Sequence, residues 1–234
     1  MENILQITSL YQNYGKTQAL KDITLDIPSG KIVGLLGPNG SGKTTLIKII
    51  MGLLSSYKGE IRIAGEEPGI NANKHIAYLP DRNHIPTWLT ANQAINLFSD
   101  FYSDFDRQRT HEMLTKMNIS TDVKIKTLSR GTQEKVQLAL VMSRRAGLYV
   151  LDEPLGAVDP ASREFIINTI LKNYPENATI LLSTHIISDI EPILDIAIFL
   201  KEGEITLCDD ADKIREEHSL SLDGLFREVF KNVY

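Results

Sequence analysis

The sequence is almost without cysteine and has no long apolar run, and each lack excludes a class of protein. Cys208 is the single cysteine among 234 residues, so no internal disulfide can form. The start, Met1-Glu2-Asn3, lacks the basic and then apolar pattern of a secretory signal. A helix that spans a membrane needs about 18 apolar residues in a row, and the sequence has no such run. We therefore expect a cytoplasmic protein whose membrane association, if it has one, is peripheral.

Basic residues are also scarce relative to acidic ones. The chain has 25 lysines and arginines against 30 aspartates and glutamates, which gives a net charge of −5. A protein whose main partner is nucleic acid has the opposite balance, so we expect no nucleic-acid partner. Apolar residues make up 42% of the chain, which is enough to fill a core and excludes a disordered protein.

The first third of the chain alternates short β-strands with turns. Ile23, Leu25 and Ile27 alternate with polar residues, and this period of two predicts a half-buried antiparallel ribbon. The apolar run at residues 32–36 predicts instead a strand buried on both faces, as in a parallel sheet. The other elements expected here are strands at residues 4–7 and 59–63 and a helix at residues 43–51.

The middle of the chain, residues 82–147, predicts a nested helical subdomain, because apolar residues recur at helical spacing and glycine is nearly absent. The sheet then resumes with a βαβ unit and a closing hairpin. The fold class is therefore α/β, with a main domain at residues 1–210 and a C-terminal helical segment at 211–234. The expected helices are 92–102, 107–118, 134–145 and 161–174, and the expected strands are 148–151, 178–183, 196–200 and 204–207.

A glycine-rich segment between the strand at 32–36 and the next helix fits the pattern G-x-x-x-x-G-K-[ST]. Glycines let the backbone wrap a phosphate with its N–H groups inward, and the following helix adds its positive end. The lysine would hold the β- and γ-phosphates, and the threonine hydroxyl would bind Mg²⁺. The expected nucleotide-binding residues here are Gly37, Pro38, Asn39, Gly40, Ser41, Gly42, Lys43, Thr44 and Thr45.

Two acids, Asp152 and Glu153, follow the strand at 148–151, where open α/β sheets bind their ligands. Asp152 can hold Mg²⁺ through water, and Glu153 can orient and deprotonate an attacking water. The alternative is an acidic turn that caps the next helix. His185 ends the next strand, where it either donates to the γ-phosphate or is an ordinary histidine bound to backbone.

Ser129 and Gly131 lie just before the helix expected at residue 134, where they offer a hydroxyl and an unobstructed N–H group at a positive helix end. An ordinary helix N-terminus explains them equally well. They follow Lys43 by about 90 residues, so a phosphate bound here would belong to a nucleotide on a neighbouring molecule.

In this order the motifs resemble the ATP-binding subunit of ABC transporters over essentially the whole chain. Residues 37–44 resemble the Walker A loop, 148–152 resemble Walker B, and 156–159 resemble the D-loop. The resemblance implies a P-loop NTPase core with an N-terminal antiparallel β subdomain. It also implies ATP and Mg²⁺ as bound groups, a transmembrane permease partner, and a head-to-tail homodimer or heterodimer. Its implied roles are Glu153 as catalytic carboxylate, His185 as switch histidine, Tyr14 as the adenine-stacking aromatic, and Ser129 and Gly131 as the signature that contacts the partner's ATP.

The chain departs from the family pattern at two places. The signature, usually LSGGQ, has Arg130 and Thr132 in place of its middle glycine and its glutamine, and such variants occur in exporters of the ABC-2 type. The resemblance therefore implies a subunit that powers export. Asp81 replaces a glutamine found in many members, and its carboxylate can still face Mg²⁺ through water, although it is shorter and charged.

The sequence leaves two interpretations of each of two segments, and it also allows two other functions for the chain. Residues 81–90, with Trp88 and Leu89, resemble the surface on which a permease docks, or Trp88 is a packing anchor for the helical subdomain. Residues 211–234 form a helix packed on its own domain or a dimer contact. The rival functions are a soluble ABC-type ATPase in protein or iron–sulfur assembly, and a non-hydrolysing member of a heterodimer.

Overall fold

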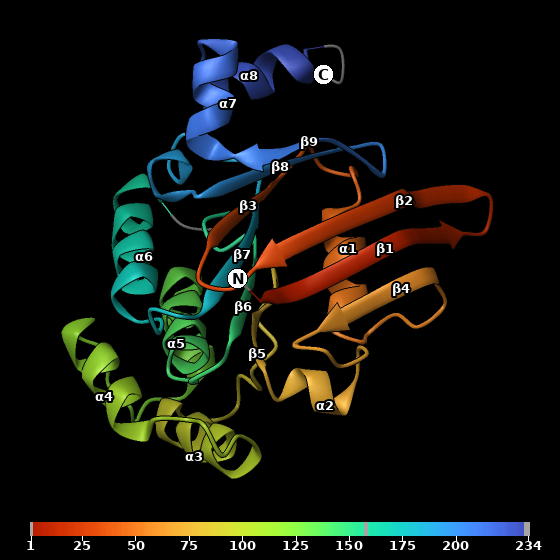
Figure 1. Cartoon of the computed structure of the whole chain (residues 1–234). Helices are drawn as coiled ribbons and strands as arrows, with labels where there is room; N and C mark the ends of the chain where they lie inside the picture. The colour runs from red at the N-terminus through yellow and green to blue at the C-terminus, as the bar shows by residue number, and fades with distance from the viewer. Residues whose placement is uncertain (1, 157–158, 232–234) are drawn as a thin grey trace.

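A computed structural model describes residues 2–156 and 159–231, with two sheets among them. The larger, six-stranded sheet has the order β5-β6-β7-β3-β8-β9, and all its pairs are parallel except β8 with β9. The predicted buried strand at 32–36 is its central strand β3 (Figure 1). Its members are β3 (Ile32–Leu36), β5 (Ile76–Leu79), β6 (Leu148–Asp152), β7 (Thr179–Thr184), β8 (Ile196–Lys201) and β9 (Glu204–Asp210).

The smaller sheet is the expected antiparallel ribbon, with the order β2-β1-β4. Its strands are β1 (Asn3–Tyr14), β2 (Thr17–Pro28) and β4 (Lys58–Ile63). Two of them are longer than predicted, because positive φ angles at Ser9 (46°) and Asp22 (51°) interrupt the period of two without ending the strands. The alternation of apolar and polar residues therefore covers only part of β1 and β2.

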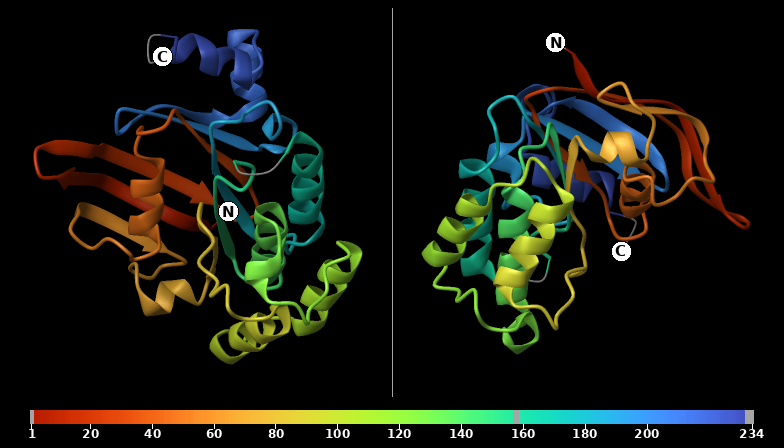
Figure 2. Two further views of the ribbon diagram at one scale, coloured as in Figure 1. Left: turned by 180° about the vertical axis from the view of Figure 1, so that it is seen from behind. Right: turned by 90° about the horizontal axis from the view of Figure 1, so that it is seen from below.

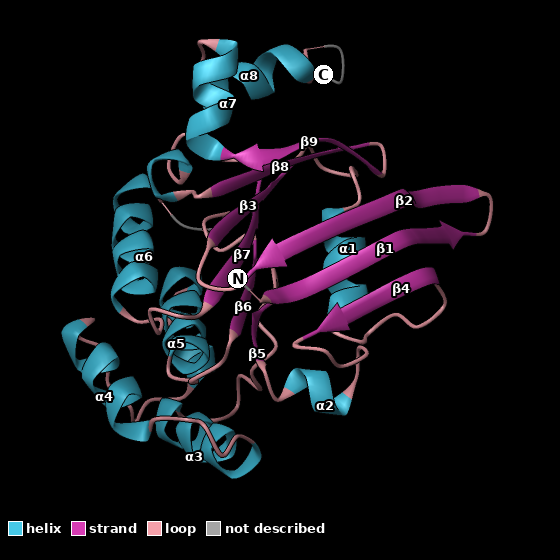
Figure 3. Ribbon diagram, in the orientation of Figure 1, coloured by secondary structure: helices cyan, strands magenta, loops and turns pink. Residues whose placement is uncertain are grey.

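Each face of the large sheet has its own core, because side chains alternate even along the fully buried strand β3. Val33 and Leu35 face helix α1 (Lys43–Ile50) and the antiparallel sheet. Ile32 and Leu36 face the other helices, among them α5 (Arg130–Met142) and α6 (Pro160–Lys172). Figure 3 shows this layering, with α1 between the two sheets and α5 and α6 across the large sheet.

The nested subdomain between β5 and β6 contains α3 (Ala91–Phe101), α4 (Arg107–Lys116) and α5. Helices α3 and α4 lie beyond the β5 edge of the sheet, and α5 contacts both β5 and α4 (Figure 2). The prediction that its third helix spans 134–145 is wrong. The N-cap is Ser129, whose Oγ accepts the N–H of Thr132 at 3.2 Å, so α5 begins at Arg130. It ends at Met142 because Arg144 turns inward, where its guanidinium bonds the Asp104 carboxylate and the Ile76 carbonyl.

The C-terminal segment is two helices where a single one was expected. Ser219, at a φ of 53°, separates α7 (Ala211–His218) from α8 (Leu222–Val229). The ring centroids of Phe226 and Phe230 lie 5.7 and 6.1 Å from that of Phe199 on β8. The apolar face of α8 thus packs on its own domain, which favours the first of the two alternatives.

Two short elements were not predicted, the helix α2 (Ile70–Asn73) and the edge strand β5. Single turns also occur as 3₁₀-helices at Ile125–Thr127 and Glu191–Ile193. None of the helices in the described ranges is both long and apolar enough to cross a membrane.

Candidate functional site

A cavity of about 450 Å³ opens at the edge of the large sheet where the parallel strands β3, β6 and β7 end. It collects most of the candidate residues from distant parts of the chain. Tyr14, 48% exposed, lines one end together with Ala19. The other lining residues are Asn39, Gly40, Gly42, Lys43, Thr44, Thr45, Asp81, Arg130, Glu153, Gly156 and His185.

The glycine-rich segment forms the floor of this cavity, between the end of β3 and the start of α1. Gly42 has a φ of 113°, and a Cβ at this position would lie 2.8 Å from the Ala19 carbonyl, so a side chain cannot fit. Ser41 is buried in the loop, 3% exposed. Gly42 is the N-cap of α1 and, as glycine, supplies no side chain to cap the helix. The positive end of the helix therefore points into the cavity, where it favours an anion.

Lys43 lies beneath the loop with its side chain only 6% exposed. Its ammonium donates to the carbonyls of Gly37, at 2.6 Å, and Pro38, at 3.2 Å. The Glu153 carboxylate lies 3.7 Å from the same Nζ. Burial lowers the pKa of Lys43, and the charges of Glu153 and Asp152 act in the opposite direction. A buried cation thus joins the loop to the acids at the end of β6.

Asp152 is the last residue of β6 and is 2% exposed. The Ser183 hydroxyl on β7 donates to its Oδ1 at 2.5 Å. Burial raises the pKa of Asp152, the Ser183 hydrogen bond lowers it, and the charges of Glu153 and Asp81 raise it. Burial also raises the pKa of the neighbouring Tyr78 to about 12, with further contributions from the Asp152 and Asp81 charges. Three acids therefore share one small region of high negative charge.

Glu153 occupies a strained position at the centre of the cavity. Its φ is 50°, a left-handed conformation that residues other than glycine rarely adopt. Its N–H is held by Ser183, 3.0 Å from the carbonyl and 3.2 Å from the hydroxyl. Its Oε2 lies 3.0 Å from Nδ1 of His185. The carboxylate is therefore fixed between an imidazole and the Lys43 ammonium.

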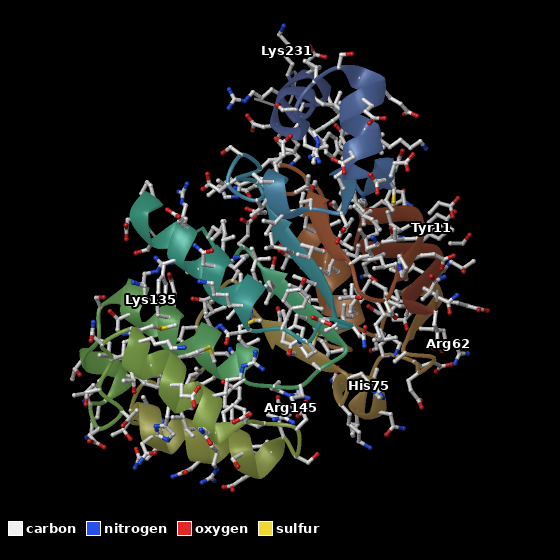
Figure 4. The ribbon with its side chains drawn as sticks, turned by 60° about the vertical axis from the view of Figure 1, so that its left-hand side comes forward. Tyr11, Arg62, His75, Lys135, Arg145 and Lys231 are labelled. Carbon is white, nitrogen blue, oxygen red and sulfur yellow. The ribbon has the colours of Figure 1, made fainter. Side chains whose placement is uncertain are left out.

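Ser129 and Gly131 are not part of this assembly. Within the described residues, neither lines the cavity of its own chain. The Ser129 hydroxyl is exposed and lies 2.8 Å from that of Thr132. Figure 4 labels Lys135 on the same helix, on the opposite side of the large sheet from Tyr11 and Arg62 of the antiparallel sheet. The structure thus divides the predicted binding residues into a cavity group and a separate group at the start of α5.

Sequence reasoning did not place Arg130 at the cavity. Its side chain, 78% exposed, pairs with Glu134 at 3.2 Å and also lines the cavity. A long cation beside a phosphate-binding motif was the available signal. Of the segment resembling the D-loop, Ala157 and Val158 lie outside the described residues.

Comparison with known proteins gives one family. The family model described as "ABC transporter" matches residues 20–156. The chain is 32% identical to the "Uncharacterized ABC transporter ATP-binding protein YdbJ" of Bacillus subtilis over 210 residues, 87% of this chain and 68% of that protein. It is 30% identical to the "SkfA peptide export ATP-binding protein SkfE" of the same species, over 86% of this chain and 87% of the relative. A solved "Structure of ATP binding subunit of ABC transporter" superposes with a TM-score of 0.86 at 27% identity, over 97% of this chain and 99% of that one.

Proposed function

Because the chain belongs to the ABC transporter family as an ATP-binding protein and ATPase, we propose that it powers export through a separate membrane-spanning permease. The observation that carries the ATPase part of the proposal is Glu153, which lies between His185 and Lys43 in the cavity of the phosphate-binding loop. An acid that is to activate water must lie beside the phosphate under attack. The loop and the acid share one cavity here.

The cavity residues hold ATP in this proposal. Tyr14 stacks on the adenine at the open end of the cavity, while the N–H groups of the loop and the start of α1, Thr45 included, bind the phosphates. Lys43 pairs with the β- and γ-phosphates. The phosphates compete with Glu153 for the Lys43 ammonium, so that ATP binding frees the carboxylate.

The residues proposed to bind Mg²⁺ suit it chemically. Thr44, Asp152 and Asp81 offer only oxygen atoms, and Ser183 occupies one oxygen of Asp152. The described residues contain no cluster of three or more histidine, cysteine, aspartate or glutamate side chains that could hold a metal alone. Mg²⁺ characteristically binds through one or two carboxylates together with substrate phosphates. When bound, the ion neutralises charge on the phosphates.

Hydrolysis proceeds by attack of water on the γ-phosphorus. Glu153 orients the water and accepts its proton, the new P–O bond forms, and the bond from the γ-phosphorus to the bridging oxygen breaks, which releases ADP. Before ATP binds, Nδ1 of His185 lies 3.0 Å from Oε2 of Glu153. Once ATP is bound, the N–H of His185 donates to the γ-phosphate. The strained backbone of Glu153 supports this role, because such strain is concentrated at functional sites.

A second ATPase chain completes the site. Ser129, at the start of α5, presents its hydroxyl to solvent rather than to its own cavity. In a head-to-tail homodimer or heterodimer, Ser129 and the N–H of Gly131 would meet the γ-phosphate held by the other chain. Closure on ATP and opening after hydrolysis then supply the two states that drive a partner.

The permease docks on the loop that follows β5. Trp88 is 67% exposed and Leu89 only 7%, so Leu89 is the packing anchor and Trp88 is available to a partner. A second cavity, of about 420 Å³, lies close by and is lined by Leu53, Phe98 and Tyr102 among others. Through this contact the chain is bound to the cytoplasmic face of the membrane. The similarity to SkfE, which is named a peptide export ATP-binding protein, supports export as the direction of transport.

The soluble alternative, an ATPase in protein or iron–sulfur assembly, has no observation among the described residues in its favour. Co-purification with a protein of several apolar segments of about 20 residues distinguishes the two functions. Recovery of the detergent-solubilised chain with such a protein is expected. Loss of that association in Trp88→Ala, with unchanged ATPase activity of the isolated chain, would place the contact on this loop.

The test of the ATPase site is Glu153→Gln, with Glu164→Gln on the exposed face of α6 as the matched control. Loss of the general base lowers turnover by roughly 10²–10⁴. ATP affinity is retained, and light scattering detects a stable ATP-bound dimer. Glu164→Gln turns over like the parent. Parental turnover in Glu153→Gln would refute the assigned role.

A further inference from the structure

Helix α5 begins at the signature. Two glutamines one turn apart on this helix form hydrogen bonds with the loop that contains Asp81. Gln133 accepts a hydrogen bond from the Asn83 amide, with 3.3 Å between Oε1 and Nδ2. Gln137 donates from Nε2 to the Pro80 carbonyl at 3.4 Å. Residues four apart lie on one helix face, so both amides meet the same loop. Pro80, the residue that Gln137 holds, directly precedes Asp81.

Gln137 is unusual because it is a polar side chain in an almost fully buried position. It is 2% exposed, and its Oε1 has no hydrogen-bond partner among the described residues. Leaving a buried polar atom unpaired lowers the stability of the folded chain. Its neighbours on the same face of the sheet, such as Leu138 and Ile166, are apolar. Packing alone would thus favour an apolar side chain at position 137.

A narrow cavity of about 30 Å³ lies beside Gln137, and its walls include Asp81, Asp152 and Glu153. The amide oxygen and ionised carboxylates are all hydrogen-bond acceptors, so they cannot bond to one another directly. A water molecule donates two hydrogen bonds and can join an amide oxygen to a carboxylate. The cavity has the volume for one, and its polar walls supply the partners.

We propose that Gln137 is a positioning residue for ATP hydrolysis. Its Nε2 donates to the Pro80 carbonyl, and its Oε1 is joined through one bound water to the carboxylate of Asp81. This inference rests on the proposed ATPase site and adds to it a link between α5 and the acids.

The first test is Gln137→Met, which keeps the volume of the side chain but removes both polar atoms. Misplacement of the acids lowers kcat for ATP hydrolysis by about tenfold to a hundredfold, while KM for ATP stays within about twofold. The thermal unfolding midpoint checks that the fold is intact. Gln108→Met is the matched control, because Gln108 is exposed on α4 and bonds only to Glu112 among the described residues. Parental kcat in a folded Gln137→Met would overturn the proposal.

The second test is a double-mutant cycle between positions 137 and 81. If one water joins the two side chains, removing either end breaks the same link. Asp81→Ala combined with Gln137→Met then lowers kcat no further than the worse single variant. Independent effects, which multiply in kcat, would contradict the link. An inactive parent, or full turnover in Glu153→Gln, would instead refute the ATPase site itself, so the two failures are distinguishable.

Discussion

The two groups of binding residues belong to regions of very different construction. The phosphate loop and its acids rest on β3, β6 and β7, and Lys43 and Asp152 are 5% and 2% exposed. The start of α5 belongs to the nested subdomain, where Ser129 and Arg130 are exposed and bond to Thr132 and Glu134 of the same helix, and Arg130 also lines the cavity. The polar side chains of the phosphate loop and its acids bond to one another inside the chain, whereas those at the start of α5 are exposed to solvent.

This difference indicates that each chain contributes a phosphate loop to one ATP site of the proposed dimer and a signature to the other. A buried cation and strained carboxylate need a rigid frame, which the large sheet provides. A hydroxyl and an N–H at an exposed helix N-terminus need only a correctly placed anion. The proposed dimer brings these halves together, so substitutions in the two regions should fail in different ways.

The largest expected difference is in nucleotide affinity. Lys43→Ala removes the buried ammonium that pairs with the phosphates, and ATP affinity should fall by about tenfold to a hundredfold, the worth of a charge-assisted hydrogen bond. Titration calorimetry on the isolated chain measures it. Lys48→Ala, an exposed lysine of the same helix, should bind ATP like the parent. Equal ATP affinities for the two variants would contradict the assignment of the phosphates to Lys43.

A smaller effect is expected from the same substitution made in each region. A Cβ at Gly37 would lie 2.5 Å from the Ser41 hydroxyl, so Gly37→Ala should destabilise the fold by about 1–3 kcal/mol. A Cβ at Gly131 would meet nothing within 4 Å among the described residues, and alanine favours the helix by about 0.5–1 kcal/mol. Gly131→Ala should therefore unfold at a temperature no lower than the parent but hydrolyse ATP more slowly. Denaturant unfolding and steady-state ATPase assays compare Gly37→Ala with Gly131→Ala. A Gly131→Ala variant less stable than the parent would contradict the prediction that position 131 is exposed and has room for a side chain.

The phosphate-loop region could be predicted from sequence because its information is local. A buried apolar strand, a glycine-rich pattern and a helix follow one another within about 20 residues, and β3 and α1 begin where expected. The acids at the end of β6 follow from the same logic, since parallel strands end at one edge. The roles of these residues remain proposals.

The region around α5 was predicted less well, because its signals depend on the tertiary structure. The helix begins four residues earlier than predicted, at a cap that serine marks only weakly. No pattern in the sequence places Gln137 beside Asp81, since the contact joins segments far apart in the chain. The signal for Arg130, a long cation beside a phosphate-binding motif, does not show that its side chain reaches the cavity. The turn at Ser219 was not predicted, because a left-handed turn that ends a helix is usually marked by glycine and here the residue is serine.

The composite site is tested most directly by mixing two variants at an ATP concentration too low for Lys43→Ala to bind ATP, so that neither variant is active alone. Lys43→Ala disables the phosphate loop, and Ser129→Asp puts a negative charge at the signature while retaining a residue that caps α5. In a head-to-tail dimer of one copy of each, one site combines an intact Lys43 with an intact Ser129. ATPase activity should then rise well above that of either variant alone. If the mixture stays as inactive as its components although mixed dimers form, the two halves do not meet across chains and the account is contradicted.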